Sequence, residues 1–129
     1  MSDNKLNSRD EFLARTMKEY RAHRRCVMLA TIYNEYHFMP GEEYPAFLDY
    51  CIGHMEKEDE VPSVRVLCAK LAYWQCRHNA RQMEDLEKRF GEMMKRKKST
   101  GLIKARDSVM DLKSATIIQY TIKGRFMSR

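Results

Sequence analysis

The chain has 129 residues, of which 43% are hydrophobic and 33% are charged, and it contains only 5 Gly and 3 Pro. This length fits one small domain, and the residue types favour helix throughout. No apolar run approaches the ~20 residues needed to cross a bilayer, and the first residues lack the apolar core of a signal peptide, so we expect an intracellular protein without membrane insertion.

The net charge of +6 is unevenly distributed along the chain. Residues 95–129 hold ten Lys or Arg and two Asp or Glu, a net charge of +8, so residues 1–94 carry −2. Strongly basic segments are typical of chains that bind acidic proteins, nucleic acids or anionic membrane surfaces. Electrostatic recognition is therefore expected mainly at the C-terminal end.

The first predicted helix runs from Arg9 to about Tyr36. Ser8, with Glu11 three residues later, forms the capping-box pattern that begins helices. The middle of this helix contains the cationic run Arg21–Arg25. Such a run is either a contact for nucleic acid, which would need aromatic residues nearby, or a solvated helix face that needs no partner.

A shorter second helix is predicted from Tyr44 to Glu56, after a turn at Met39–Gly41. Pro45 suits its first turn, where the missing N–H has no helical partner in any case. Apolar residues at helical spacing form its core face: Phe47, Leu48, Cys51, Ile52 and Met55. The acidic run Glu56–Glu60 is predicted to be a loop.

The longest predicted helix extends from Pro62 to about Lys98, about 55 Å at ~1.5 Å per residue. Apolar residues follow three-four spacing in both halves: Val64, Leu67, Leu71 and Trp74, then Met83, Leu86, Phe90 and Met93. A polar interruption separates the halves at Cys76, His78, Asn79 and Arg81. This helix can form a coiled coil, although its Met- and Phe-rich seam favours packing against a larger assembly. Trp74 is either a core anchor or an interface hot spot.

A basic patch follows at Lys95, Arg96, Lys97 and Lys98. It is either a nuclear-localisation or phosphate-binding cluster, or a cation-rich helix end capped at Gly101. Residues 99–103 are predicted to be a hinge between a helical scaffold, residues 1–98, and a basic helix, residues 104–129.

The C-terminal segment carries the strongest functional pattern. If residues 106–123 form one helix, an apolar stripe lies along it: Ala115, Ile118, Ile122 and Phe126. Basic residues accompany the stripe: Lys113, Lys123, Arg125 and Arg129. A basic amphipathic helix of this kind binds an acidic, groove-bearing partner, is attracted to an anionic membrane surface, or packs on the rest of its own chain.

Ile118-Gln119, then three residues, then Lys123-Gly124 resembles the core of the IQ motif, which binds calmodulin and myosin light chains, with Ala115 three residues ahead. The resemblance implies that Ile118 is buried in one lobe of a light chain and that Gln119 hydrogen-bonds the backbone at its rim. It also implies that Lys123 meets acidic side chains and that Gly124 allows close approach of the second lobe. The motif is incomplete, because Ser128 stands where the family has a second basic residue.

The His and Cys residues indicate no metal site, and no catalytic motif indicates an active site. His23 with Cys26, and Cys51 with His54, have the i, i+3 spacing that places two zinc ligands on one helix face, but neither pair has a CxxC turn. We read the four cysteines as reduced and mostly buried, and assign no metal and no cofactor. No catalytic motif is present, so an enzyme is not expected.

The sequence therefore predicts an all-α protein, a helical hairpin or small bundle with one long helix and a basic C-terminal helix. The expected function is a non-enzymatic adaptor or structural subunit that binds calmodulin or a related light chain and docks on a larger complex through the long helix. One alternative is a nucleic-acid binder using Arg24, Arg25, the basic patch and the C-terminal segment. Another is a subunit of an obligate complex whose C-terminal helix is only structural. The IQ resemblance implies a cytoplasmic location in cytoskeletal or ciliary assemblies.

Overall fold

The structure is a computed structural model that describes residues 4–111, with side chains from residue 8 onward. All regular structure in this range is helical. Five helices have defined ends: α1 (Asn4–Lys18), α2 (Ala22–Glu35), α3 (Pro45–Glu56), α4 (Pro62–Cys76) and α5 (Ala80–Arg96). A further helix occupies residues 100–111 and reaches the end of the described range. The all-α prediction is therefore confirmed for this part of the chain.

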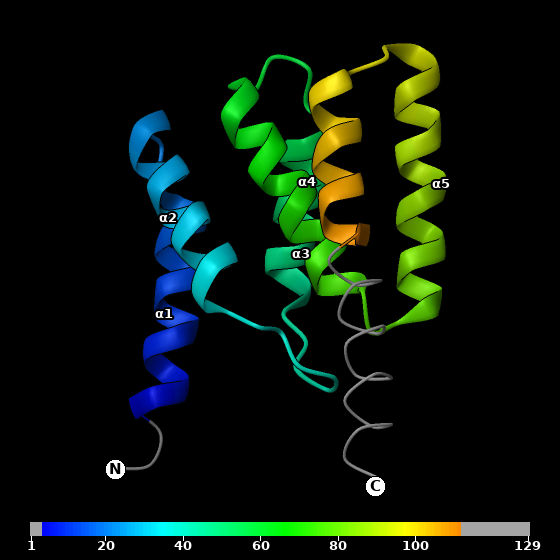
Figure 1. Ribbon diagram of the computed structural model, residues 1–129. Coiled ribbons are helices and arrows are strands. Elements are labelled where there is room, and N and C mark those ends of the chain that lie inside the picture. The colour runs from blue at the N-terminus through cyan, green and yellow to red at the C-terminus, as the bar shows by residue number, and fades with distance from the viewer. Residues whose placement is uncertain (1–3, 112–129) are drawn as a thin grey trace, which may run out of the picture.

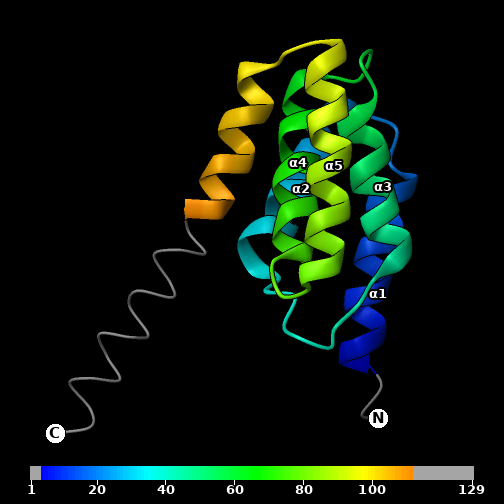
Figure 2. The ribbon, with the colours of Figure 1, turned by 90° about the vertical axis from the view of Figure 1, so that its right-hand side faces the viewer.

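The helices form antiparallel pairs that lie side by side: α1 with α2, α3 with α4, and α5 with the 100–111 helix (Figure 1). The turns within the pairs lie at one end of the stack, and the connections between pairs lie at the other (Figure 1). Viewed from the side, the 100–111 helix lies on the opposite side of the stack from α1 and α3 (Figure 2). The central helix is α4, which packs against α2, α3 and α5.

The hydrophobic core follows α4 through the molecule. Seven α4 residues are buried: Val64, Cys68, Ala69, Leu71, Ala72, Tyr73 and Cys76. α5 and the 100–111 helix, on the right of Figure 1, each present one apolar stripe to the core. The stripe of α5 consists of Leu86, Phe90 and Met93, and that of the 100–111 helix of Leu102, Ala105 and Val109. α4 is buried on most of its circumference because it has helical neighbours on several sides, whereas the outer helices bury one face only.

The single predicted helix Arg9–Tyr36 is wrong, because the chain reverses direction between α1 and α2. Glu19 stabilises this reversal: its carboxylate accepts hydrogen bonds from the backbone N–H groups of Tyr20 and Arg21, at 3.0 and 3.1 Å. A carboxylate just ahead of a helix is favourable against the positive end of the helix dipole. α1 also begins earlier than predicted, at Asn4.

The single long helix Pro62–Lys98 is wrong as well. The polar interruption at residues 76–81 contains a sharp turn, so α4 and α5 are separate helices. Asn79 caps α5, because its side-chain oxygen accepts a hydrogen bond from the backbone N–H of Gln82 at 3.0 Å. The two apolar halves therefore pack against each other within one domain instead of forming a continuous coiled-coil seam.

The predicted second helix is confirmed. α3 has Pro45 as its first residue and buries Phe47, Cys51, Ile52 and Met55, four of the five residues of the expected core face. All four cysteines are free thiols, and only Cys26 is not fully buried. Burial raises the pKa of Cys76 to about 11, because the charged thiolate is disfavoured away from water.

Residues 99–103, predicted as a hinge, contain the beginning of the 100–111 helix. Ser99 caps this helix, with its hydroxyl 3.3 Å from the backbone nitrogen of Leu102, and Leu102 is buried. A Cβ placed on Gly101 would lie 3.7 Å from the side chain of Val66, so this segment packs closely on α4.

A buried ion pair connects α2 to the α3–α4 connection. The terminal nitrogens of Arg25 donate to both oxygens of the Glu60 carboxylate at 2.8 and 2.9 Å, and Nδ1 of His54 lies 2.5 Å from the same group. The Glu60 side chain is 6% exposed. The hydrogen bonds from Arg25 are the main cause that lowers the pKa of Glu60 to about 2. Arg25, a candidate nucleic-acid contact, is thus occupied within the fold.

Candidate functional site

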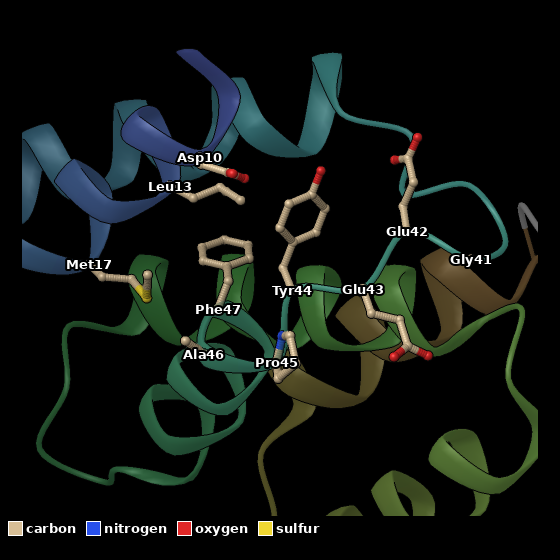
Figure 3. Close-up of a pocket in the computed structure, with 10 residues that line it drawn as sticks. All are labelled: Asp10, Leu13, Met17, Gly41, Glu42, Glu43, Tyr44, Pro45, Ala46 and Phe47. Atoms are coloured by element: carbon tan, nitrogen blue, oxygen red, sulfur yellow. The ribbon is translucent and has the colours of Figure 1, made fainter. Parts of the chain in front are cut away.

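A groove of about 510 Å³ opens between α1 and the beginning of α3 (Figure 3). We call it the α1–α3 groove. It is lined by Asp10, Leu13 and Met17 of α1, by Gly41, Glu42, Glu43 and Tyr44 of the α2–α3 connection, and by Pro45, Ala46 and Phe47 of α3. Leu13 and Phe47 are buried and form the apolar floor, whereas Asp10, Glu42 and Glu43 are exposed at the margin.

Aromatic packing fixes the wall formed by the α2–α3 connection. The ring of Phe38 stacks on Phe47 at 6.3 Å and meets Tyr44 edge-on at 5.7 Å, measured between ring centroids. Phe38 has a φ of 47°, a left-handed conformation that costs a residue with a side chain of order 1–2 kcal/mol. Because its ring is buried, packing offsets this cost. Gly41, with a φ of 89°, forms the turn that the sequence predicts at Met39–Gly41.

The margin of the groove is acidic. Arg9 pairs with Glu42 at 3.2 Å, and its guanidinium lies 4.6 Å from the centre of the Tyr36 ring. Asp10 and Glu43 have no ion-pair partner within the part of the chain that the structure describes. An apolar floor with unpaired carboxylates at its edge is complementary to a protein segment that brings an apolar side chain flanked by Lys or Arg.

Aromatic and cationic side chains also alternate along the contact between α2 and α4. Nζ of Lys70 lies 5.6 Å from the centre of the Tyr33 ring, which packs on Trp74 at 5.8 Å. The indole N–H of Trp74 donates to the carbonyl of Tyr36 at 3.1 Å, and Arg77 lies 3.6 Å over the indole ring. Trp74 therefore packs between α2 and α4 while staying partly buried, which agrees with a core anchor and does not test its role at an interface.

The basic patch, residues 95–98, is exposed at the C-terminal end of α5. α5 ends at Arg96, where the N–H of Lys97 still bonds to the carbonyl of Met93 at 3.0 Å. The capping role expected for Gly101 is wrong, because this residue lies in the next helix. Cations at a helix C-terminus are favourable against the helix dipole, so the position of the patch has a structural reason.

The IQ-like residues lie outside the described residues: Ala115, Ile118, Gln119, Ile122, Lys123, Gly124 and Phe126. The two candidate zinc pairs have other contacts, since Sγ of Cys26 lies 3.1 Å from the hydroxyl of Ser63 and His54 pairs with Glu60. Across residues 4–111, no group of three potential ligands gathers around one point.

Sequence reasoning missed the α1–α3 groove altogether. Its walls come from segments far apart in the chain, and Asp10 and Glu43 read separately as ordinary surface acids. The only local signal is Glu42-Glu43 directly ahead of the apolar face of α3.

Side-by-side antiparallel helix pairs with one continuous core are the architecture of stacked helical repeats. A family model described as a HEAT repeat domain matches residues 3–113. The chain belongs to the HEAT repeat family. The HEAT match spans every helix described above. Comparison with curated proteins and with solved structures gave no match.

HEAT repeats stack helix pairs so that each pair buries its apolar face on its neighbours, and the resulting surfaces are used for binding. In this HEAT unit, the α1–α3 groove lies between the first two pairs. Among the helices of residues 4–111, none combines the length and apolar content that a membrane span requires.

Proposed function

We propose that this HEAT unit is a non-enzymatic adaptor that binds protein partners within a larger assembly. The α1–α3 groove carries the proposal, because it combines an apolar floor at Leu13 and Phe47 with exposed carboxylates at Asp10 and Glu43 that have no ion-pair partner among the described residues. The partner is a protein segment with an apolar residue flanked by Lys or Arg. Docking through this groove replaces docking through the predicted helix Pro62–Lys98, which is divided into α4 and α5.

Charge reversal at the margin of the groove tests this function. Asp10→Lys with Glu43→Lys changes two exposed side chains and leaves the buried floor intact, so the fold should be retained. We expect quantitative affinity capture from cells to lose the partners of the wild-type chain. The control is Asp85→Lys with Glu92→Lys, which makes the same change in net charge at exposed sites on α5. Equal capture by both double variants would contradict the proposal.

For residues 114–129 we propose binding to calmodulin or a related light chain. The IQ-like order from Ile118 to Gly124, surrounded by Lys and Arg, supports this. Pull-down with calmodulin, with and without calcium, should lose binding when Ile118→Asp is combined with Gln119→Ala. Binding that survives in this double variant would remove the IQ assignment, while the role of the α1–α3 groove would still stand.

From the IQ resemblance alone we also propose a cytoplasmic location in a cytoskeletal or ciliary assembly. Imaging of the tagged full chain should show it concentrated on such a structure. A diffuse distribution, unchanged by Ile118→Asp, would count against this location.

A further inference from the structure

A second hollow, of about 400 Å³, lies at the turn between α1 and α2, and we call it the turn hollow. It is lined by Phe12, Arg15, Lys18, Glu19, Tyr20, Arg21, Arg24 and Met28. Phe12 and Met28 are half-buried and supply apolar surface, while the remaining residues are charged or exposed. The turn lies at the end of the stack opposite the α2–α3 connection (Figure 1).

The fold brings cations from two helices together here. Arg15 and Lys18 come from the end of α1, Arg21 caps α2 and Arg24 lies in its first turn, so the lining holds four cations and one carboxylate, that of Glu19. Glu19 lies 3.3 Å from Arg21 and 3.0 Å from Arg24, which holds these two side chains beside each other. The net charge of the lining is +3.

Neither Arg15 nor Lys18 has a carboxylate partner among the described residues. The guanidinium of Arg15 lies 5.5 Å from the centre of the Phe12 ring, so it is held over the apolar part of the hollow. Two cations are thus available to an anionic ligand without breaking an ion pair. This distinguishes them from Arg25, which is paired with buried Glu60.

Tyr20 is the most exposed large apolar or aromatic side chain in the described part of the chain, at 83%. Its ring contributes little to the core, and its neighbour Arg21 lies 5.8 Å from the ring centre. The aromatic residue that a nucleic-acid contact at Arg21–Arg25 requires is therefore present, directly beside the cations. An exposed ring among Arg and Lys is the arrangement on which an unpaired base stacks while the cations contact its phosphates.

We propose that the turn hollow binds single-stranded nucleic acid, with Tyr20 stacked on a base and Arg15 and Lys18 contacting the adjacent phosphates. Single strands are favoured over duplexes because base pairing and stacking hide the base faces that Tyr20 would contact. They are favoured over acidic peptides because a peptide would satisfy the cations without using the ring. The proposal is independent of the α1–α3 groove and of the IQ-like segment.

Fluorescence anisotropy with a labelled 15-nucleotide oligouridylate, titrated with the full chain at several salt concentrations, tests this inference. We expect Tyr20→Leu to weaken binding about 10-fold, since each stacked base contributes strongly in single-strand sites. Tyr20→Phe keeps the ring and should bind within about 2-fold of wild type. Lys18→Gln should reduce the slope of log K against log salt by about 0.7, the value for one phosphate contact to a single strand.

The matched control is Lys104→Gln, which removes one exposed cation from the 100–111 helix and should leave the affinity close to wild type. Binding that is unchanged by both Tyr20→Leu and Lys18→Gln would overturn the proposal, because it would place the contact on other basic segments. Equal affinity for a duplex of the same length would also overturn it. Displacement of the oligonucleotide by an equal concentration of an oligoglutamate peptide would assign the hollow to an acidic protein partner instead.

Discussion

At Glu60, one buried carboxylate joins α2 through Arg25 and α3 through His54, and it also accepts from the backbone N–H of Val61, the residue just ahead of α4. Glu60→Ala leaves Arg25 buried without its counter-charge, and we expect a loss of about 3–5 kcal/mol in the free energy of unfolding, measured with denaturant. The control is Glu84→Ala, which removes an exposed pair with Lys88 and should change stability by less than ~0.5 kcal/mol. Equal effects of the two substitutions would show that the buried pair is not structural.

The same carboxylate makes stability depend on pH. The pKa of Glu60 falls from its ordinary 4.5 to about 2 in the folded chain, so between these values the unfolded chain binds more protons than the native one. The contribution of Glu60 is fully present above pH 4.5 and is lost as the pH falls toward 2. Unfolding free energies measured from pH 7 to pH 3 should therefore decline less steeply for Glu60→Gln than for wild type. If the unfolding free energies of wild type and Glu60→Gln fell in parallel with pH, the ion pair at Glu60 would not contribute to stability.

At the scale of elements, a side-chain cap at Asn79 stabilises the turn that separates α4 from α5. Asn79→Ala removes the acceptor for the N–H of Gln82 and should lower the free energy of unfolding by about 1 kcal/mol. Asn79→Asp keeps an acceptor and should remain close to wild type. Thermal unfolding of the three proteins checks this, and an Asp variant as unstable as the Ala variant would mean that the side chain does not act as a cap.

Some helix boundaries can be predicted from the sequence, and others cannot. α3 is predictable because a turn precedes it, Pro45 marks its first residue and its apolar stripe has one face. The chain reversals at residues 19–21 and 77–79 are not predictable in this way. Apolar residues at three-four spacing lie on both sides of each reversal, and no Gly or Pro marks the break. Glu19 and Asn79 act through hydrogen bonds to the backbone, and similar residues are common on exposed helix faces.

At the scale of the whole molecule, the stack depends on α4, the central helix. Leu71 is fully buried within it, and Leu71→Ala should cost about 2–5 kcal/mol through lost contacts and the cavity left behind. Val27→Ala, at a side chain that is 52% exposed on α2, should change stability by less than ~0.5 kcal/mol. Denaturant unfolding should show one cooperative transition for both variants. Similar losses in the two would contradict a core centred on α4.

The two candidate sites also depend on the whole fold, because helices must pack together to form them. The α1–α3 groove requires α1 and α3 to pack side by side, and the turn hollow requires α1 and α2 to fold back on each other. Charge counts along the sequence place the basic character at the C-terminal end and miss the acidic groove, while the cationic run Arg21–Arg25 indicates only part of the basic hollow. The IQ-like segment differs from these two sites, because its residues are close together in the sequence and the motif can be identified without knowing the fold.

The most direct measurement of protein binding at the groove is site-specific photo-crosslinking in cells. Ala46 is exposed, neutral and part of the groove lining, so a benzoylphenylalanine placed there reports contacts without removing a rim charge. We predict cross-links to a protein segment that contains an apolar residue between Lys or Arg, and their loss when Asp10→Lys is added. The same probe at Lys88, exposed on α5, should give no such product. Cross-links of equal yield at both positions, or unaffected by Asp10→Lys, would contradict the assignment of the α1–α3 groove as a docking site.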